Sequence, residues 1–328
     1  MISKHPIPGL LRDSELDEIV ASYTKQRLLV EIDEQARDML ARRGAATGWE
    51  AAAREKGFTR FVLGEHRMAG EIAAGETYNV MLGQHLFLGR VDVLKVVRAH
   101  KIGPAVVAAH LRRLHAQASL NCAQVVRVYD VGCEGALHFA VVEHVMGTNL
   151  RNLVRKRGPL PMNLAATIFA QAAIALDAMH SHGYMHCGLR PSKILVAEGA
   201  DGVTKLCDAG SGEAFGVVNG PLMNTGGRVL DFLAPEVIAG EAATTASDVY
   251  SLGCLLYYAV TSKVPFPGGT EDWKREAHRR LYPMHPKNLA EGLDDSFIEV
   301  IAAMMAKEPS KRLEGMRDVV AGLHKWVR

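Results

Sequence analysis

Apolar residues between positions 13 and 43 recur mostly at intervals of three and four, with charged residues between them. The positions are Leu16, Ile19, Val20, Tyr23, Ile32, Ala36, Met39 and Leu40. This spacing predicts an amphipathic helix or a pair of helices, and residues 48–57 predict a second, short helix that ends at Gly57. We expect residues 1–60 to form a helical extension that either packs on the rest of the chain or binds a partner.

The pattern changes after position 60, where short apolar or alternating runs are separated by glycines. The runs are "FTRFVLG", "RMAGEIAAG", "TYNVMLG", "HLFLG" and "VDVLKVV", and they predict an antiparallel meander. A helix is expected at about 104–119, followed by two strands in "VVRVYDVG" and "LHFAVVEHV". Residues 61–144 are therefore predicted to form a strand-rich lobe.

Helical patterns dominate the rest of the chain, from 145 to 328. The predicted helices are "TNLRNLVRKRG", "NLAATIFAQAAIALDAMHSHG", "SDVYSLGCLLYYAVTS" and "DDSFIEVIAAMMAKE". Two short strands, "KILVAE" and "VTKLCD", are expected between them. The chain thus predicts an α+β protein in which strands come first and helices follow.

Composition narrows the function classes. The 38 basic and 36 acidic residues give a net charge of +2, so no strong field favours nucleic acid or a membrane surface. Apolar runs such as "CLLYYAV" are much shorter than the roughly 20 residues that span a bilayer, and the N-terminus does not resemble a signal peptide. The five cysteines lack metal-ligand spacing, so we expect reduced thiols, no metal and a cytoplasmic protein.

Several motifs in one order resemble the eukaryotic-type protein kinase family, especially the bacterial Ser/Thr kinases, over residues 66–325. They are "VDVLKVV" with Lys95, "MHCGLRPSKILV" with His186, "CDAG" with Asp208, "LAPEV" with Glu236, "SDVYSLGCLLY" with Asp248 and "KEPSKRL" with Arg312. The resemblance implies a two-lobe kinase-like fold with an antiparallel-sheet N-lobe, a helical C-lobe and the N-terminal helical extension.

The resemblance also implies roles for particular residues. Asp248 should brace the backbone of the loop that contains His186, and Arg312 should form a buried ion pair with Glu236. The nucleotide site of the family falls on Lys95, Asp208, Lys193, Gly75, Val80, Val93 and Leu195. These seven residues are predicted to be what remains of a nucleotide cleft.

The loop that carries the chemistry departs from the family pattern at two positions. Gly188 stands where the catalytic aspartate should be, and it has no group that accepts a proton. Lys193 stands where an asparagine should bind the second Mg²⁺, and an ammonium group cannot coordinate a cation.

The remaining nucleotide-site motifs are also altered. No Asp or Glu lies between Asp92 and Asp130, so Lys95 needs an anion other than a helix glutamate. We expect Asp208 to be that partner, ahead of Glu143 or Glu76. Four further positions depart from the family. In the glycine loop, Ala73 and Tyr78 stand at two of the three glycine positions and only Gly75 is kept; Val93 replaces a smaller residue, and Ala209 replaces a phenylalanine.

From these losses we predict that the chain is not an enzyme but a pseudokinase. It would act as a scaffold or allosteric regulator, using residues 1–60 and 211–232 to bind other proteins such as an active kinase or a signalling complex. No catalytic residue is assigned, because the framework of Glu236, Asp248 and Arg312 is kept while the chemistry is lost, although a fold alone does not define a function.

Two alternatives stay open. The first is a regulator that binds ATP weakly and without Mg²⁺, with Lys193 neutralising phosphate charge; in a competing arrangement Lys95 and Lys193 both pair with Asp208 and close the site. The second is an atypical active phosphotransferase that uses another carboxylate, such as Glu213 or Asp231.

Overall fold

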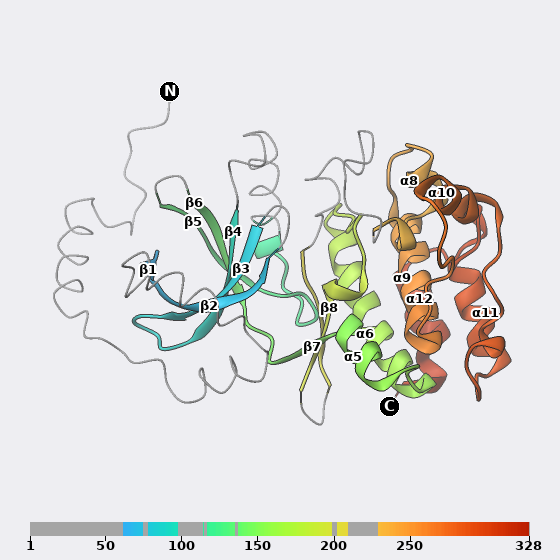
Figure 1. Ribbon diagram of the computed structural model, residues 1–328, viewed down its shortest axis with the longest axis horizontal. Coiled ribbons are helices and arrows are strands. Elements are labelled where there is room, and N and C mark those ends of the chain that lie inside the picture. Colours follow the sequence, from blue (N-terminus) through green and yellow to red (C-terminus); the bar gives the residue numbers. More distant parts are fainter. Residues whose placement is uncertain are drawn as a thin grey trace. The chain divides into compact units, whose positions relative to one another are not determined.

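The computed structural model describes residues 62–74, 78–97, 114, 117–134, 137–198, 202–208 and 229–327 (Figure 1). The described residues fall into two compact units. The first contains those up to Ala74 together with Val80–Asp92, and the second contains most of the rest, from Val93 onward. The predicted extension over 1–60 and most of the predicted helix over 104–119 lie outside the described residues, as does most of the 211–232 segment.

The first unit contains the start of the predicted meander. Its strands are β1 (Val62–Leu63), β2 (His66–Ala74), β3 (Tyr78–His85) and the first residues of β4 (Val91–Val97), in the order β1-β2-β3-β4. β1 pairs with β2 in antiparallel register, with Leu63 opposite His66. Leu63, Met68 and Leu82 are buried and supply its apolar interior.

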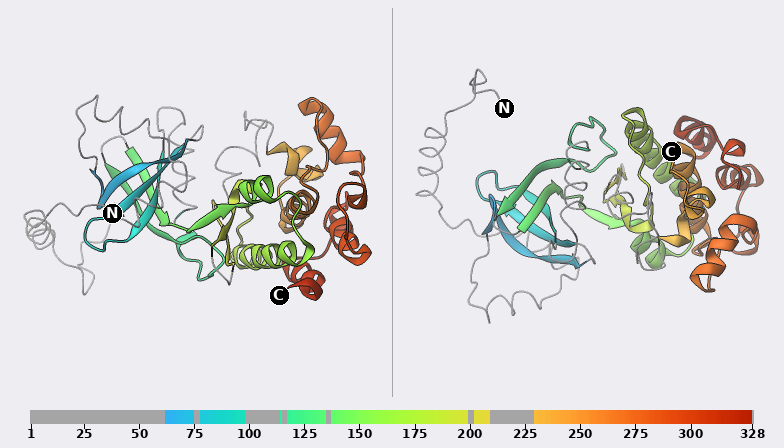
Figure 2. Two further views of the ribbon diagram at one scale, coloured as in Figure 1. Left: turned by 60° about the horizontal axis from the view of Figure 1, so that its bottom comes forward. Right: turned by 90° about the horizontal axis from the view of Figure 1, so that it is seen from above.

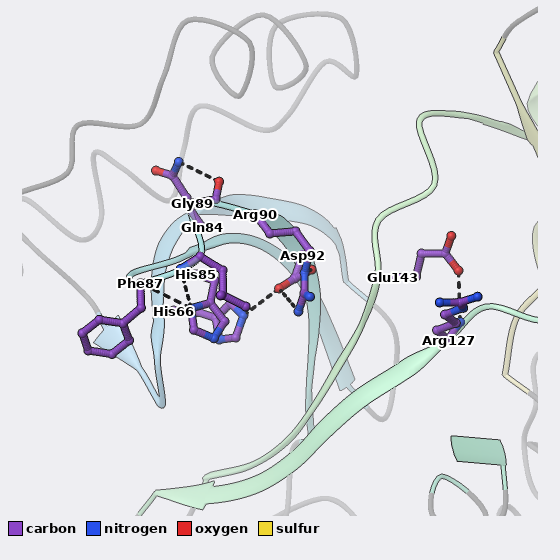
Figure 3. A network of polar contacts seen from close by, with 10 residues as sticks. His66, Gln84, His85, Phe87, Gly89, Arg90, Asp92, Arg127 and Glu143 are labelled. Carbon is purple, nitrogen blue, oxygen red and sulfur yellow. Dashed lines mark hydrogen bonds and ion pairs between the residues drawn. The ribbon is translucent and has the colours of Figure 1, made fainter. Parts of the chain in front are cut away.

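A buried polar network lies inside this unit (Figure 3). The Asp92 carboxylate is fully buried and accepts hydrogen bonds from His66 Nε2 at 2.9 Å and from Arg90 Nε at 2.7 Å. Burial alone would raise the pKa of Asp92, but the hydrogen bonds from His66 and Arg90 outweigh it and lower the pKa. The network joins β2 to β4 through a charged group that no apolar pattern predicts.

The second unit begins with the rest of β4 and continues the sheet in the order β4-β6-β5. β5 (Val128–Glu134) and β6 (Leu137–Glu143) form an antiparallel hairpin with a register shift between Val128 and Asp130. A separate antiparallel sheet contains β7 (Gly147–Asn149), β8 (Ile194–Ala197) and β9 (Thr204–Leu206). Its register places Ile194 opposite Leu206.

Helices make up the remainder of the second unit. They are α5 (Leu150–Arg157), α6 (Met162–Ser181), α8 (Pro235–Ile238), α9 (Thr245–Thr261), α10 (Glu271–Arg280), α11 (Asp295–Met304) and α12 (Met316–Leu323). Short 3₁₀ turns lie at Pro191–Lys193, Leu230–Phe232, Pro286–Asn288, Pro309–Lys311 and His324–Trp326. Figure 2 shows these helices, coloured green to red, from two further sides.

The core of the second unit forms around α6 and α9, which pack against each other. α9 is buried along almost its whole length, and a capping box between Thr244 and Ser247 fixes its start. α6 is rich in buried alanines, which let neighbouring helices approach closely, and it also packs against α12. By length and composition α6 could cross a membrane, but more than half of it is buried, as expected of a core helix.

Candidate functional site

The candidate site centres on Asp208, which two lysines contact. Lys95 Nζ, from β4, binds Asp208 Oδ1, and Lys193 Nζ, from the end of the 3₁₀ turn Pro191–Lys193, binds Asp208 Oδ2. All three residues belong to the second unit. Of the three anions considered for Lys95, the structure therefore shows a contact with Asp208.

The backbone around β8 and β9 fixes Lys193 and Asp208 side by side. The Lys193 N–H donates to the Arg190 carbonyl at 2.8 Å, and the Lys193 carbonyl accepts from the Cys207 N–H at 3.0 Å. Asp208 has a φ of 61°, a left-handed conformation that is uncommon for a residue with a side chain. The β8–β9 pairing and the hydrogen bond between the Cys207 N–H and the Lys193 carbonyl place Asp208, the residue after Cys207, beside Lys193.

The cluster is almost completely buried. Lys95 and Asp208 are each 7% exposed, and Lys193 is 4% exposed. A buried ammonium group is costly unless it is paired, and removal of one partner of a buried pair costs about 3–5 kcal/mol. The carboxylate of Asp208 is therefore a charge partner that offsets the cost of burying both lysines.

Lys95, Lys193 and Asp208 do not provide the oxygen ligands that two divalent cations would need. Mg²⁺ binds oxygen ligands, commonly one or two carboxylates, whereas Lys193 offers an ammonium group in contact with Asp208. Within the part of the chain that the structure describes, no three His, Cys, Asp or Glu side chains are grouped closely enough to hold a metal.

Asp248 of α9 holds the backbone of the loop that follows α6. Its Oδ2 accepts the His186 N–H at 2.7 Å, and its Oδ1 accepts the Cys187 N–H at 3.1 Å. Cys187 has a φ of 57°, so the two hydrogen bonds also fix a strained residue. His180 Nε2 lies 2.9 Å from Asp248 Oδ2, a contact that sequence reasoning missed although His180 lies only six residues before His186.

The His186 ring lies between this loop and β9. Its Nε2 is 3.2 Å from the Cys207 carbonyl, which only accepts, so the proton sits on Nε2. Burial lowers the pKa of His186, even though Asp248 acts in the opposite direction, and the ring is therefore neutral at physiological pH. Gly188 follows two residues later, half-buried and without a left-handed φ.

Glu236 of α8 and Arg312 form a two-pronged buried ion pair. Arg312 Nη1 donates to Glu236 Oε1 at 2.7 Å, and Nη2 donates to Oε2 at 2.8 Å. Ser247 Oγ donates to the same carboxylate at 2.7 Å, a contact that sequence reasoning did not anticipate. Burial alone would raise the pKa of Glu236, but the hydrogen bonds from Arg312 and Ser247 lower it.

The other residues considered for the site are distributed as follows. Val93 is buried in β4, Leu195 is half-buried in β8, and Val80 is half-buried in β3 of the first unit. Glu143 pairs with Lys205 at 2.9 Å and accepts the Arg127 N–H at 3.1 Å, as Figure 3 shows for Arg127. Asp231 contacts Lys274 of α10. The positions that lie outside the described residues are Gly75, Glu76, Ala209 and Glu213.

A strand-rich first part, a helix-rich second part, a loop held by Asp248 and a buried lysine–aspartate contact define a kinase-like protein. The protein kinase domain family matches residues 67–327. Serine/threonine-protein kinase PknB of Mycobacterium tuberculosis is 31% identical over 269 residues, which cover 80% of this chain and 43% of that protein. PknB of Mycolicibacterium smegmatis is 30% identical with the same coverage.

The chain belongs to the protein kinase domain family. A crystal structure of Rad53 residues 1–466 in complex with AMP-PNP matches with a TM-score of 0.67 and 23% identity, covering 80% of this chain and 66% of that one. The predicted fold, an antiparallel-sheet N-lobe followed by a helical C-lobe, is therefore confirmed. The chain spans less than half the length of the curated relatives it matches.

The prediction of a non-enzymatic pseudokinase scaffold is wrong on these findings, because the relatives are named serine/threonine-protein kinases. It gave too much weight to Gly188 and Lys193. Phosphoryl transfer passes through a loose transition state, so catalysis depends mainly on positioning and electrostatic stabilisation rather than on one proton acceptor. The Lys95–Asp208 contact and the loop held by Asp248 are both formed without a carboxylate at residue 188.

Proposed function

We propose that the chain is an ATP-dependent Ser/Thr protein kinase whose transfer step runs without a carboxylate at residue 188. The observation that carries this proposal is the buried contact between Lys95 and Asp208, 113 residues apart in the chain. In the family this lysine pairs with the nucleotide phosphates. The names of the relatives support the same reaction class and a protein as the acceptor.

The proposed step balances without a carboxylate at position 188. The hydroxyl oxygen of a Ser or Thr in the acceptor protein bonds to the γ-phosphorus while the bond to the bridging oxygen breaks. ADP leaves with that electron pair, and the hydroxyl proton passes to an oxygen of the transferred phosphoryl group or to water. A positioned general base typically contributes 10²–10⁴-fold, so we expect turnover lower by roughly that factor than the 1–100 s⁻¹ typical of kinases.

Lys95, Asp208 and Asp248 position the nucleotide phosphates and the loop around Gly188. Lys95 binds phosphate oxygens, and Asp208 orients Lys95 through their contact. Asp248 fixes the loop around Gly188 by accepting two backbone N–H groups, which keeps open the approach of the acceptor hydroxyl. The molecule that receives the phosphoryl group is a Ser or Thr side chain of another protein or of the chain itself.

The test is transfer from γ-labelled ATP to the chain itself and to a generic basic acceptor protein, over long incubations. Wild type is compared with Lys95→Met, and Lys311→Met is the matched control because Lys311 is a lysine in an exposed surface ion pair. We expect slow incorporation on Ser or Thr that Lys95→Met reduces at least about tenfold and that Lys311→Met leaves unchanged. Incorporation that is absent from wild type, or that persists in folded Lys95→Met, would refute the proposal.

A further inference from the structure

A lysine in a buried cluster of charges is the least expected feature of this site. Lys193 is 4% exposed, and its ammonium group contacts one oxygen of Asp208 while Lys95 contacts the other. Lysine is almost never so completely buried unless it is paired. The ammonium group of Lys193 is therefore held at one defined place inside the protein.

The geometry of the backbone makes Lys193 a fixed rather than a mobile charge. Its carbonyl and its N–H are both bonded, at 3.0 Å to Cys207 and at 2.8 Å to Arg190. The next residue, Ile194, is paired with Leu206 in the β8–β9 ladder. A long side chain held at its base by two hydrogen bonds and at its tip by Asp208 presents positive charge at a defined point.

We infer that Lys193 occupies the place of a divalent cation, so that the chain binds the phosphates of ATP through Lys95 and Lys193 without needing that ion. The inference rests on the proposed function only for the identity of the ligand. An ammonium group has three N–H donors, so Lys193 can contact Asp208 and a phosphate oxygen together. Unlike a metal ion, it is covalently attached to the site and cannot be removed by a chelator.

The ammonium group of Lys193 can take over one of the two tasks that a divalent metal ion performs in kinases. In kinases the metal ions bridge phosphate oxygens and offset their charge. A lysine ammonium is a compact, strongly hydrated point charge that can do the second of these tasks. It lacks the geometric demands of Mg²⁺, so the site tolerates the absence of an oxygen ligand at residue 193.

The experiment measures binding of a fluorescent ATP analogue, mant-ATP, to the full chain in excess EDTA and in excess Mg²⁺. We expect wild type to bind with dissociation constants that differ by less than about threefold between the two conditions, which corresponds to well under 1.4 kcal/mol. Lys193→Asn restores an oxygen ligand and removes the ammonium group. In this variant we expect EDTA to weaken binding by about tenfold or more.

Further variants distinguish the effect of the charge at residue 193 from an effect on folding. Lys193→Arg keeps the charge and should stay insensitive to EDTA, whereas Lys193→Met should weaken binding in both conditions. Lys311→Met, an exposed lysine, should match wild type. Thermal melts establish that each variant is folded, and the wild-type comparison does not depend on any variant.

The outcomes distinguish this inference from the proposed function. Wild-type binding that collapses in EDTA, or that is absent in both conditions because Asp208 holds both lysines, overturns the inference. Binding that persists in EDTA without any phosphoryl transfer supports it and refutes the proposed kinase activity. If phosphoryl transfer occurs but strictly requires Mg²⁺, and if EDTA abolishes ATP binding, the proposed kinase activity is supported and the inference about Lys193 is refuted.

Discussion

Asp248 in α9 and the backbone of His186 are joined by a 2.7 Å hydrogen bond that ties a core helix to the loop of the candidate site. The acceptor is a buried carboxylate whose other oxygen takes the N–H of Cys187 at 3.1 Å. Hydrogen bonds to charged groups each contribute about 1.5–3 kcal/mol. The loop around Gly188 is thus ordered by a residue 60 positions later in the chain.

Asp248→Asn should weaken both the fold and the site. The amide keeps one acceptor oxygen but turns an NH₂ group toward a donor that the carboxylate satisfied, so we expect the free energy of unfolding to fall by about 2–3 kcal/mol. Urea denaturation measures this change. Asp177→Asn is the matched control because Asp177 pairs with the exposed Arg317, and it should change stability by less than about 1 kcal/mol. Equal effects from both variants would contradict the bracing role.

The ion pair between Glu236 and Arg312 should show strong coupling. Arg312→Met leaves a buried carboxylate without its main partner, and we expect a loss of about 3–5 kcal/mol. Glu236→Gln should also destabilise, and the double variant should cost less than the sum by about 1–3 kcal/mol.

Denaturation of the four proteins in one double-mutant cycle measures this coupling energy. Lys311→Met is the control, because the neighbouring pair of Lys311 and Glu308 is exposed and should contribute less than about 0.5 kcal/mol. Additive losses from the two single variants would show that Glu236 and Arg312 act independently.

The buried His278 should make the free energy of unfolding depend on pH in the acid range. Burial, with Lys307 and Lys274 nearby, lowers the pKa of this fully buried histidine to about 3, and its Nδ1 lies 3.0 Å from the Tyr250 hydroxyl. The unfolded chain takes up a proton as the pH falls below 6.5 while the folded chain does not. Stability is therefore full above pH 6.5 and falls by up to about 1.4 kcal/mol per pH unit down to about pH 3.

Denaturation curves at pH 7 and pH 5 test this linkage. His278→Asn should be less stable than wild type at pH 7 but should lose about 1–2 kcal/mol less on going to pH 5. His324→Asn, at an exposed position, should keep the wild-type pH dependence. An identical pH dependence in wild type and His278→Asn would contradict the lowered pKa.

The sequence predicted the long elements of the fold because their apolar spacing is sustained. α6 and α9 were expected from such runs, and both form the core of the second unit. β7 was not expected, since three residues of sequence Gly-Thr-Asn carry no alternating apolar pattern. α10 was also not expected, because its ten residues include only two that are buried.

The candidate site was less accessible to sequence reasoning because its contacts join distant residues. Lys95 and Asp208 are 113 positions apart. Outside the site, the link between Asp92 and His66 spans 26 positions, and nothing in either strand pattern indicates a buried carboxylate. Lys193 and Asp208 were recognised through the family motifs, but the motifs left open whether Lys193 meets a phosphate or a carboxylate. That choice depends on the β8–β9 register and on the left-handed φ of Asp208.

Gly188→Asp should increase the rate of phosphoryl transfer. Gly188 does not have a left-handed φ, so its backbone conformation is open to an aspartate. A carboxylate here would accept the hydroxyl proton that otherwise passes to the phosphoryl group or to water, and a positioned base contributes about 10²–10⁴-fold. We expect kcat to rise at least about tenfold, measured by label transfer to the same acceptor protein.

Gly315→Asp is the matched control for this gain. It adds the same carboxylate at the start of α12, where a side chain meets no atom within 4 Å, and it should leave kcat unchanged. If Gly188→Asp leaves kcat unchanged while nucleotide binding is intact, the step that limits turnover is not proton removal. Slow positioning of the acceptor or slow release of ADP would then account for the low rate, and Lys95→Met would still reduce transfer at least about tenfold because phosphate binding precedes both steps.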